Sequence, residues 1–277
     1  MTSLVEALGY PADACLVIVT CDGLGICHAI NAGVYSALRE GMGRAAGLVV
    51  PGPWAREAAA RYRGEDVGVQ LTLNSEHDLL RWGPITYCPS LLDGDGGFPR
   101  TAEDLWDHAD VDEARRECRA QIERAIYWGF DVSHISCHLG ALESRPEFFD
   151  VALEMAIDFG LPLRLPDSTD EARLGFPFRS LAAEEGVISP DHLVRVTGGR
   201  STRSALDQLL SDIRPGVTEV VLRPAVDSPE LRAVLPDWAS RVADHDLAMT
   251  SDSLRVLTAR AGVHLVGYRQ LRDLQRR

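Results

Sequence analysis

Short apolar runs alternate with stretches of helical periodicity along nearly the whole chain. Residues 14–20 (ACLVIVT) are continuously apolar, as is typical of a buried parallel strand, and residues 28–39 follow with a helical pattern. Further strands are predicted at 46–50, 67–73, 132–136, 161–165, 216–222 and 263–266, and further helices at 53–62, 112–128, 146–159, 236–243 and 251–261. Repeated strand–helix units predict an α/β fold with a parallel sheet, either doubly wound or closed into a barrel.

Two stretches lack this periodicity. Residues 74–101 and 166–199 are rich in Pro, Gly and Asp, which predicts two long loops. Long loops in a compact domain usually carry function. The chain shows neither a repeat of fixed period nor a clear linker, so we expect a single domain over residues 1–277.

The charge of the chain excludes several functions. Among its 277 residues, 28 basic against 41 acidic side chains give a formal net charge of -13. A chain this acidic repels phosphate backbones, so we expect no nucleic-acid partner. Every basic residue is Arg, which excludes Schiff-base chemistry, a Walker-type phosphate lysine and a lysine general base.

The sequence predicts a cytoplasmic protein with reduced thiols. It contains no run of the ~18 apolar residues that a membrane helix needs, and its first residues lack the features of a signal peptide. Its six cysteines form no CxxC pair and are too sparse for a secreted disulfide scaffold.

Polar side chains cluster at the carboxyl ends of four predicted strands. In parallel α/β folds the chemistry lies beyond these ends, so we expect the side chains to converge on one rim. The residues at these strand ends are Asp22, Gln70, Asn74, Glu76, His77, His134, His138 and Arg223.

Two apparent motifs are weak. Gly23 and Gly25 after the first strand suggest a dinucleotide loop, but His28 stands where the third glycine belongs. His134 and His138 have the spacing of a metal pair. On a strand-to-loop transition this spacing does not bring both rings to one face, so a hydrogen-bonded structural His134 is favoured.

Three further residues also have structural interpretations. Cys137 beside a histidine suggests a thiol nucleophile, but adjacent strand residues point to opposite faces, and a small buried residue is favoured. Asp22 is either a base or the N-terminal cap of the following helix. Arg223, which precedes a proline, either faces the site or pairs with a surface acid.

Four motifs in order resemble those of the YdjC-like carbohydrate deacetylases. They are residues 16–28 (LVIVTCDGLGICH), 68–76 (GVQLTLNSE) continued by 81–84 (RWGP), 134–140 (HISCHLG) and 222–225 (LRPA). The likeness extends to residues 146–149 (PEFF) and 267–269 (GYR). The resemblance implies a (β/α) barrel related to the TIM barrel, of the polysaccharide-deacetylase type. It also implies descent from hydrolases that remove acetyl groups from amino sugars with one divalent metal.

The resemblance assigns roles to residues, and several family side chains are replaced here. Asp22 matches the family's catalytic base, but Gly23 stands at the position of the metal-binding aspartate that follows. Gln70 stands where the family has a metal-binding histidine, whereas His138 matches the remaining metal-binding histidine. Arg223 replaces a histidine that assists the tetrahedral intermediate.

These replacements predict a site without a metal. A catalytic metal is normally held by about three protein ligands, and here two of the three family ligands are missing. Gly23 offers no side-chain donor, and the neutral amide of Gln70 is a poor substitute for imidazole on zinc. A fixed cation at Arg223 would repel a metal and instead favour a carboxylate, phosphate or enolate. We therefore expect no metal and no cofactor.

The favoured hypothesis is a metal-free enzyme made from the deacetylase scaffold. Asp22 and His138 would be the acid–base pair, with Arg223 stabilising negative charge. The expected reaction is a cyclisation, isomerisation or elimination on a small polar molecule of secondary metabolism. The residues expected to bind the substrate are Gln70, Asn74, Glu76, Trp82 and His134.

Two other hypotheses stay open. The chain could be a Zn- or Mg-dependent deacetylase of N-acetylated amino sugars or related metabolites, with replacement ligands among Glu76, His77 and His28. It could instead be a non-catalytic sugar-binding protein that stacks its ligand on Trp82 and Tyr87. The expected partners are a small-molecule substrate and, as one option, a second copy in a homodimer. No membrane partner is expected.

Overall fold

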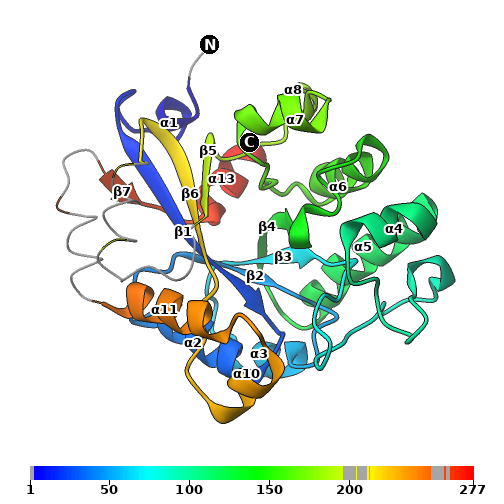
Figure 1. The fold of residues 1–277 in the computed structure, drawn as a ribbon. Helices are drawn as coiled ribbons and strands as arrows, with labels where there is room; N and C mark the ends of the chain where they lie inside the picture. Colours follow the sequence, from blue (N-terminus) through cyan, green and yellow to red (C-terminus); the bar gives the residue numbers. More distant parts are fainter. Residues whose placement is uncertain (1–2, 196–203, 205–210, 212, 251–258, 260–262) are drawn as a thin grey trace.

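The strands form one parallel sheet. The computed structural model describes residues 3–195, 204, 211, 213–250, 259 and 263–277. The sheet has seven strands in the order β4-β3-β2-β1-β6-β5, with β7 paired to β1 (Figure 1). The strands are β1 (Cys15–Leu24), β2 (Ala45–Leu48), β3 (Val67–Leu71), β4 (Val132–Cys137), β5 (His192–Arg195), β6 (Gly216–Leu222) and β7 (Val263–Leu265). The predicted parallel α/β architecture is confirmed.

Helices cover the outside of this sheet, as Figure 1 shows for α2 and α11 on one side and α5 and α6 on another. The α-helices are α1 (Leu4–Ala7), α2 (His28–Arg39), α3 (Ala55–Arg61), α4 (Ala102–His108), α5 (Val111–Tyr127), α6 (Pro146–Phe159), α7 (Glu171–Leu174), α8 (Phe178–Glu184), α10 (Pro229–Val234), α11 (Trp238–Met249) and α13 (Tyr268–Gln275). The short 3₁₀ helices are η1 (Pro89–Leu91), η2 (His138–Gly140) and η3 (Ser168–Asp170). The helix predicted at 251–261 lies outside the described residues.

Local signals explain why some predicted elements have the observed bounds. Helix α6 begins with Pro146, whose fixed φ suits a first helical turn, and ends before Gly160, which adopts a left-handed φ of 59°. Asp110 caps α5 by accepting hydrogen bonds from the amides of Asp112 and Glu113. These signals lie in the chain itself and need no tertiary partner.

Two predictions are wrong in detail. The strand predicted at 161–165 is only a single bridge between Ile135 and Leu163, because Pro162 has no N–H to donate to a neighbouring strand. The stretch 166–199 is not one long loop, since its described part contains η3, α7, α8 and β5.

The sheet is barrel-like. The Leu163 amide donates to the carbonyl of Ile188 at 3.0 Å, and the Arg164 amide donates to Ile135 at 2.8 Å. These single contacts connect the β4 edge to the chain that leads into β5. The strand order is that of an open sheet, and isolated contacts rather than a full strand bridge this side, which is consistent with the barrel-like fold that the family resemblance implies.

Strand β1 is the centre of the core. All ten of its residues are buried, and it pairs with β2, β6 and β7. It runs four residues beyond the predicted end at Thr20, so Asp22 lies inside the strand near its carboxyl end. The pairing with β2 shifts register between Asp22 and Leu24, around Gly23, whose φ is 95°. Only glycine adopts this φ without strain.

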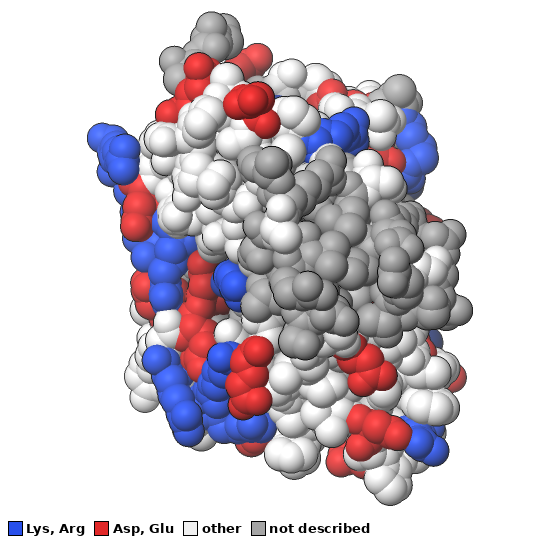
Figure 2. Space-filling view, turned by 90° about the vertical axis from the view of Figure 1, so that its left-hand side faces the viewer, with Lys and Arg blue, Asp and Glu red and all other residues white. Residues whose placement is uncertain are grey.

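The net charge is not gathered in one patch on the visible surface. On the face that Figure 2 shows, arginines in blue and acidic residues in red lie beside one another, mainly along the left margin and the lower part. The six cysteines are buried and free, in agreement with the expected reduced thiols. Within the described residues, no helix has both the length and the apolar character that crossing a bilayer requires.

His134 packs directly over a glycine of the neighbouring strand. Its ring is fully buried and stacks on Tyr268 with ring centroids 3.8 Å apart. Burial lowers the pKa of His134 well below its usual value, and the charge of Arg164 adds to this effect. A Cβ added to Gly68 would come within 2.4 to 2.5 Å of three atoms of the His134 ring. Gly68 is therefore required by packing.

Gly68→Ala is expected to destabilise the protein by about 1–3 kcal/mol, because the buried ring has no room to retreat. Urea denaturation at neutral pH measures the change in the free energy of unfolding. Gly94→Ala is the matched control, since a Cβ there meets nothing within 4 Å. Equal stability of the two variants would contradict the packing argument.

Candidate functional site

A cavity of about 620 Å³ lies at the carboxyl ends of the central strands. Strands β1, β3, β4 and β6 all contribute to its wall, as expected for a parallel α/β fold. Five residues that the sequence assigned to the site line it: Asp22, Gln70, Glu76, His138 and Arg223. The predicted convergence on one rim is therefore present.

Asp22 is held by a buried arginine that the sequence analysis did not identify. Arg164 donates from Nη1 and Nη2 to the two oxygens of Asp22 at 2.7 and 3.1 Å. Its Nε and Nη2 also donate to Glu219 at 2.9 and 2.5 Å, and the Tyr268 hydroxyl donates to the other Glu219 oxygen at 2.5 Å. Burial alone would lower the pKa of Arg164, but Asp22 and Glu219 raise it well above the usual value. Arg164 is thus a permanent cation beside Asp22.

Gln70 completes the surroundings of Asp22. Its amide nitrogen lies 3.3 Å from Asp22 Oδ2 and donates to it. Its amide oxygen is buried and accepts no hydrogen bond from any described residue. A buried acceptor without a donor is costly, so a ligand that presents a hydroxyl or N–H there would be stabilised.

His138 is paired with Glu76, and no hydrogen bond among the described residues joins it to Asp22. The Nε2 atom of His138 lies 2.9 Å from Glu76 Oε2. Burial alone would raise the pKa of Glu76, but the charge and hydrogen bond of His138, followed by His77, lower it to about 2. Glu76 is therefore ionised at neutral pH and accepts the proton on Nε2. The other ring nitrogen, Nδ1, has no hydrogen bond to a described residue and is the free acceptor in the neutral imidazole.

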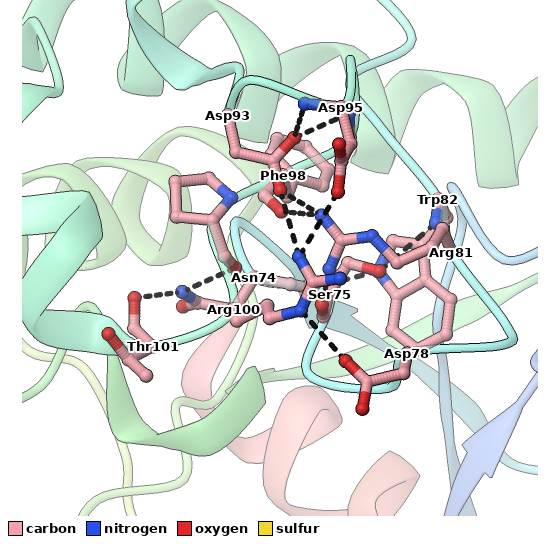
Figure 3. A network of polar contacts seen from close by, with 12 residues as sticks. Asn74, Ser75, Asp78, Arg81, Trp82, Asp93, Asp95, Phe98, Arg100 and Thr101 are labelled. Carbon is pink, nitrogen blue, oxygen red and sulfur yellow. Dashed lines mark hydrogen bonds and ion pairs between the residues drawn. The ribbon is translucent and has the colours of Figure 1, made fainter.

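The loop after β3 is a braced structure that fixes Glu76. Figure 3 shows its network, in which hydrogen bonds run from Arg81 to Ser75, Asp93 and Phe98, from Arg100 to Asp78 and Asp93, and from Asn74 to Pro99 and Thr101. The Trp82 indole donates to the Asn74 carbonyl at 2.8 Å and packs edge-on against the rings of His77 and His138. The loop therefore determines where the carboxylate of Glu76 meets His138.

Three residues expected to bind the substrate do not line the cavity. Asn74 is fully buried and holds the loop closed, and Trp82 packs behind the histidines. His134 lies in the sheet interior against Tyr268. Their sequence position at strand ends is correct, but their side chains point into the packed interior. They position the site rather than contact its contents.

Arg223 is at the rim, where it pairs with a surface acid. Its guanidinium lies 3.2 Å from Asp237 and is half exposed, while its amide donates to Asp244. This is the structural alternative that the sequence left open. The buried cations of the cavity are instead Arg164 and Arg241, and both were missed. Arg164 carried one signal: it is the only charged residue in the apolar run 161–165.

The side chains present do not suit a divalent metal. Gly23 offers no donor, both oxygens of Asp22 are paired with Arg164, and Nε2 of His138 is paired with Glu76. Within the described part of the chain, no group of three or more His, Cys, Asp and Glu side chains is arranged to hold a metal ion. With two buried guanidinium groups in the same wall, Arg164 and Arg241, this donor set disagrees with the metal requirement of the family that the motifs resemble.

The replacement metal ligands considered from the sequence do not complete a metal site. His28 is half exposed, pairs with Glu57 at 3.4 Å and does not line the cavity. His77 lies 3.2 Å from Glu76 and does not line the cavity. Tyr87, considered for sugar stacking, is 87% exposed and does not line the cavity either.

Glu143 is a second buried carboxyl group in the cavity wall. Its Oε1 has no hydrogen-bond partner among the described residues. Burial raises its pKa to about 7, although Arg195 and Arg164 act in the opposite direction. The unfolded chain releases this proton near the ordinary glutamate pKa of 4.5, so the folded protein binds more protons between about pH 4.5 and 7. Glu143 therefore costs stability as the pH rises through that window.

Glu143→Gln is expected to stabilise the protein at about pH 8 by on the order of 1–3 kcal/mol, because the amide carries no charge to bury. Below about pH 4.5 the advantage should disappear, since the wild-type carboxyl is then protonated in both states. Urea denaturation at both pH values measures the difference. The exposed Glu184→Gln is the control, and a pH-independent difference for Glu143→Gln would refute the assignment.

Comparisons with known proteins find a matching family model, curated relatives and a similar solved structure. A family model described as "YdjC-like protein" matches residues 16–260. A carbohydrate deacetylase of Thermus thermophilus is 35% identical over 276 residues, which cover 98% of each chain. One of Geobacillus stearothermophilus is 29% identical over 93% of this chain and 98% of its own. A crystal structure from Enterococcus faecalis V583, provisionally described as a cellobiose-phosphate cleavage protein, has a TM-score of 0.81 at 23% identity. It covers 93% of this chain and 99% of that one.

Proposed function

The chain belongs to the YdjC-like protein family, and from this premise we propose that it is an enzyme that acts on a small, carbohydrate-like polar molecule by metal-free acid–base catalysis. The observation that carries the proposal is the His138–Glu76 pair in the same cavity as the Asp22–Arg164 pair. Its relatives are named carbohydrate deacetylases, which supports a carbohydrate-like substrate. The donor set supports a mechanism without a metal.

His138 would transfer the proton. Because ionised Glu76 accepts from Nε2–H, the imidazole presents the lone pair of Nδ1 as the base. Nδ1 takes a proton from the substrate, and the imidazolium that forms is stabilised by the adjacent carboxylate. The same atom then returns the proton to another position or to the leaving group. This cycle serves a cyclisation, an isomerisation or an elimination, and such proton transfer contributes roughly 10²- to 10⁴-fold to a rate.

Asp22 and Gln70 would orient the substrate. The Asp22 oxygens are fixed by Arg164 and retain lone pairs that accept hydrogen bonds from substrate hydroxyl groups. The unpartnered Gln70 oxygen accepts one more. Two rigid acceptors side by side match a polyol, since each of its hydroxyl groups donates one hydrogen bond.

The test separates metal-free acid–base catalysis from the deacetylation for which the relatives are named. Purified protein is incubated with N-acetylglucosamine, N,N'-diacetylchitobiose and their de-acetylated and oxidised analogues, and products are followed by NMR and acetate release. We expect turnover that survives dialysis against a chelator and does not rise when zinc is added. Metal content is measured on the same sample.

Two results would overturn the proposal. Activity that is lost on chelation and restored by zinc would establish a metal-dependent deacetylase. Sugar binding without turnover across the whole panel would establish a binding protein. Tyr87→Ala is the control variant and should keep wild-type activity, because this exposed residue lies outside the cavity lining.

A further inference from the structure

Arg241 on α11 is a buried cation with an unused donor. Its side chain is 4% exposed, and its Nε is held by Asp237 at 3.0 Å. Its Nη1 is buried, lies in a residue that lines the cavity, and has no hydrogen-bond partner among the described residues. A buried guanidinium N–H without an acceptor is costly, because the N–H has lost water and gained nothing.

Arg241 Nη1 lies beside the position where Gly23 has no side chain. A Cβ on Gly23 would lie 3.5 Å from Arg241 Nη1, so a side chain at this position would reach the guanidinium. Glycine leaves that space without an acceptor. Gly23 and Arg241 both line the cavity, so a ligand in the cavity has access to the same space. The missing acceptor can therefore come from a bound molecule.

Of the other four cations of the wall, Arg164, Arg173 and Arg223 are paired with acids. Arg164 is saturated by Asp22 and Glu219, and Arg223 is paired with Asp237. Counting all lining residues, the cations are Arg164, Arg173, Arg195, Arg223 and Arg241, and the acids are Asp22, Glu76, Glu143 and Asp170. A wall with five arginines and four acids contrasts with a chain of net charge -13. The cavity wall is thus much less acidic than the chain as a whole.

We propose that the substrate carries an oxyanion, a carboxylate or a phosphate, and that Arg241 Nη1 binds one of its oxygens in the space beside Gly23. This inference rests on the proposed function for the identity of the cavity as the substrate site. A guanidinium suits this task, because its charge is permanent and its planar N–H groups match carboxylate and phosphate oxygens.

Calorimetric titration of the wild-type protein with glucuronate, glucose 6-phosphate and glucose tests the inference. At least one anionic sugar is expected to bind roughly 10- to 100-fold more tightly than glucose. Which of the two binds more tightly distinguishes a carboxylate from a phosphate. Arg241→Gln should abolish the preference, and Arg241→Lys should restore part of it. Arg232→Gln, an exposed arginine paired with Asp227 outside the cavity lining, controls for the loss of one positive charge.

Equal affinity for glucose and for both anionic sugars would overturn the inference, and this comparison needs no variant. An unchanged preference in a folded Arg241→Gln protein would overturn it as well. Circular dichroism checks folding, and Arg241→Lys replaces the glutamine variant if that one does not fold. Anion binding without turnover would leave this inference standing and remove the proposed function. Turnover of neutral sugars with no anion preference would leave the proposed function standing and overturn this inference.

Discussion

His138→Gln is expected to lower kcat by roughly 10²- to 10⁴-fold, because the variant loses the base that transfers the proton. Glutamine keeps the approximate size of the side chain and a hydrogen bond to Glu76, so the fold should persist. Glu76→Gln should cause a smaller loss, because an amide still orients the ring but cannot balance the charge of an imidazolium. Steady-state kinetics on the substrate found in the NMR screen measures both variants.

The matched control is His108→Gln, which removes an exposed histidine on α4 outside the cavity lining. A His138→Gln variant that keeps more than about a tenth of wild-type activity would show that proton transfer lies elsewhere. Glu76→Gln needs a stability check. The pKa of Glu76 is about 2 in the folded protein, against an ordinary glutamate pKa of 4.5. Its charge therefore stabilises the fold above about pH 4.5, and this contribution is lost as the pH falls toward 2.

Arg164→Met is expected to lower the free energy of unfolding by about 3–5 kcal/mol. The reason is that Asp22 and Glu219 would remain buried without their cation. Both carboxylates have side chains no more than 9% exposed, so water cannot replace the lost partner. Urea denaturation followed by circular dichroism measures the loss.

Arg173→Met provides the contrast for this prediction. Arg173 also lines the cavity, but it is 68% exposed and pairs with a single acid, so its loss should cost no more than about 1 kcal/mol. Arg164→Lys keeps the charge but cannot span both carboxylates, and an intermediate loss is expected. This variant also serves if Arg164→Met does not fold. Similar stabilities for Arg164→Lys and wild type would mean that the bidentate geometry contributes little.

The fold and the location of the site were predictable from the sequence because both depend on local patterns. The predicted helices 28–39 and 146–159 and the strand 216–222 agree with α2, α6 and β6 at both ends. Once the strands are parallel, their carboxyl ends must lie on one edge. The residues that follow them then meet without any further information.

The partners within the site were not predictable in the same way. The sequence paired Asp22 with His138, whereas the structure pairs Asp22 with Arg164 and His138 with Glu76. Arg164 lies 142 positions from Asp22, and nothing local indicates that they meet. The directions of Trp82 and His134 also depend on tertiary packing, because a position at a strand end does not say which way a side chain points.

Strand β1 has a consequence for how the protein moves. Because β1 bonds to β2, β6 and β7, its amide protons should exchange with solvent only when the whole molecule unfolds. Asp22 and Gly23 lie near the end of this strand, so the part of the cavity wall that they form should be rigid. Any opening that admits a ligand must come from other lining segments, such as η2 after β4 and α7, which should show the faster deuterium uptake.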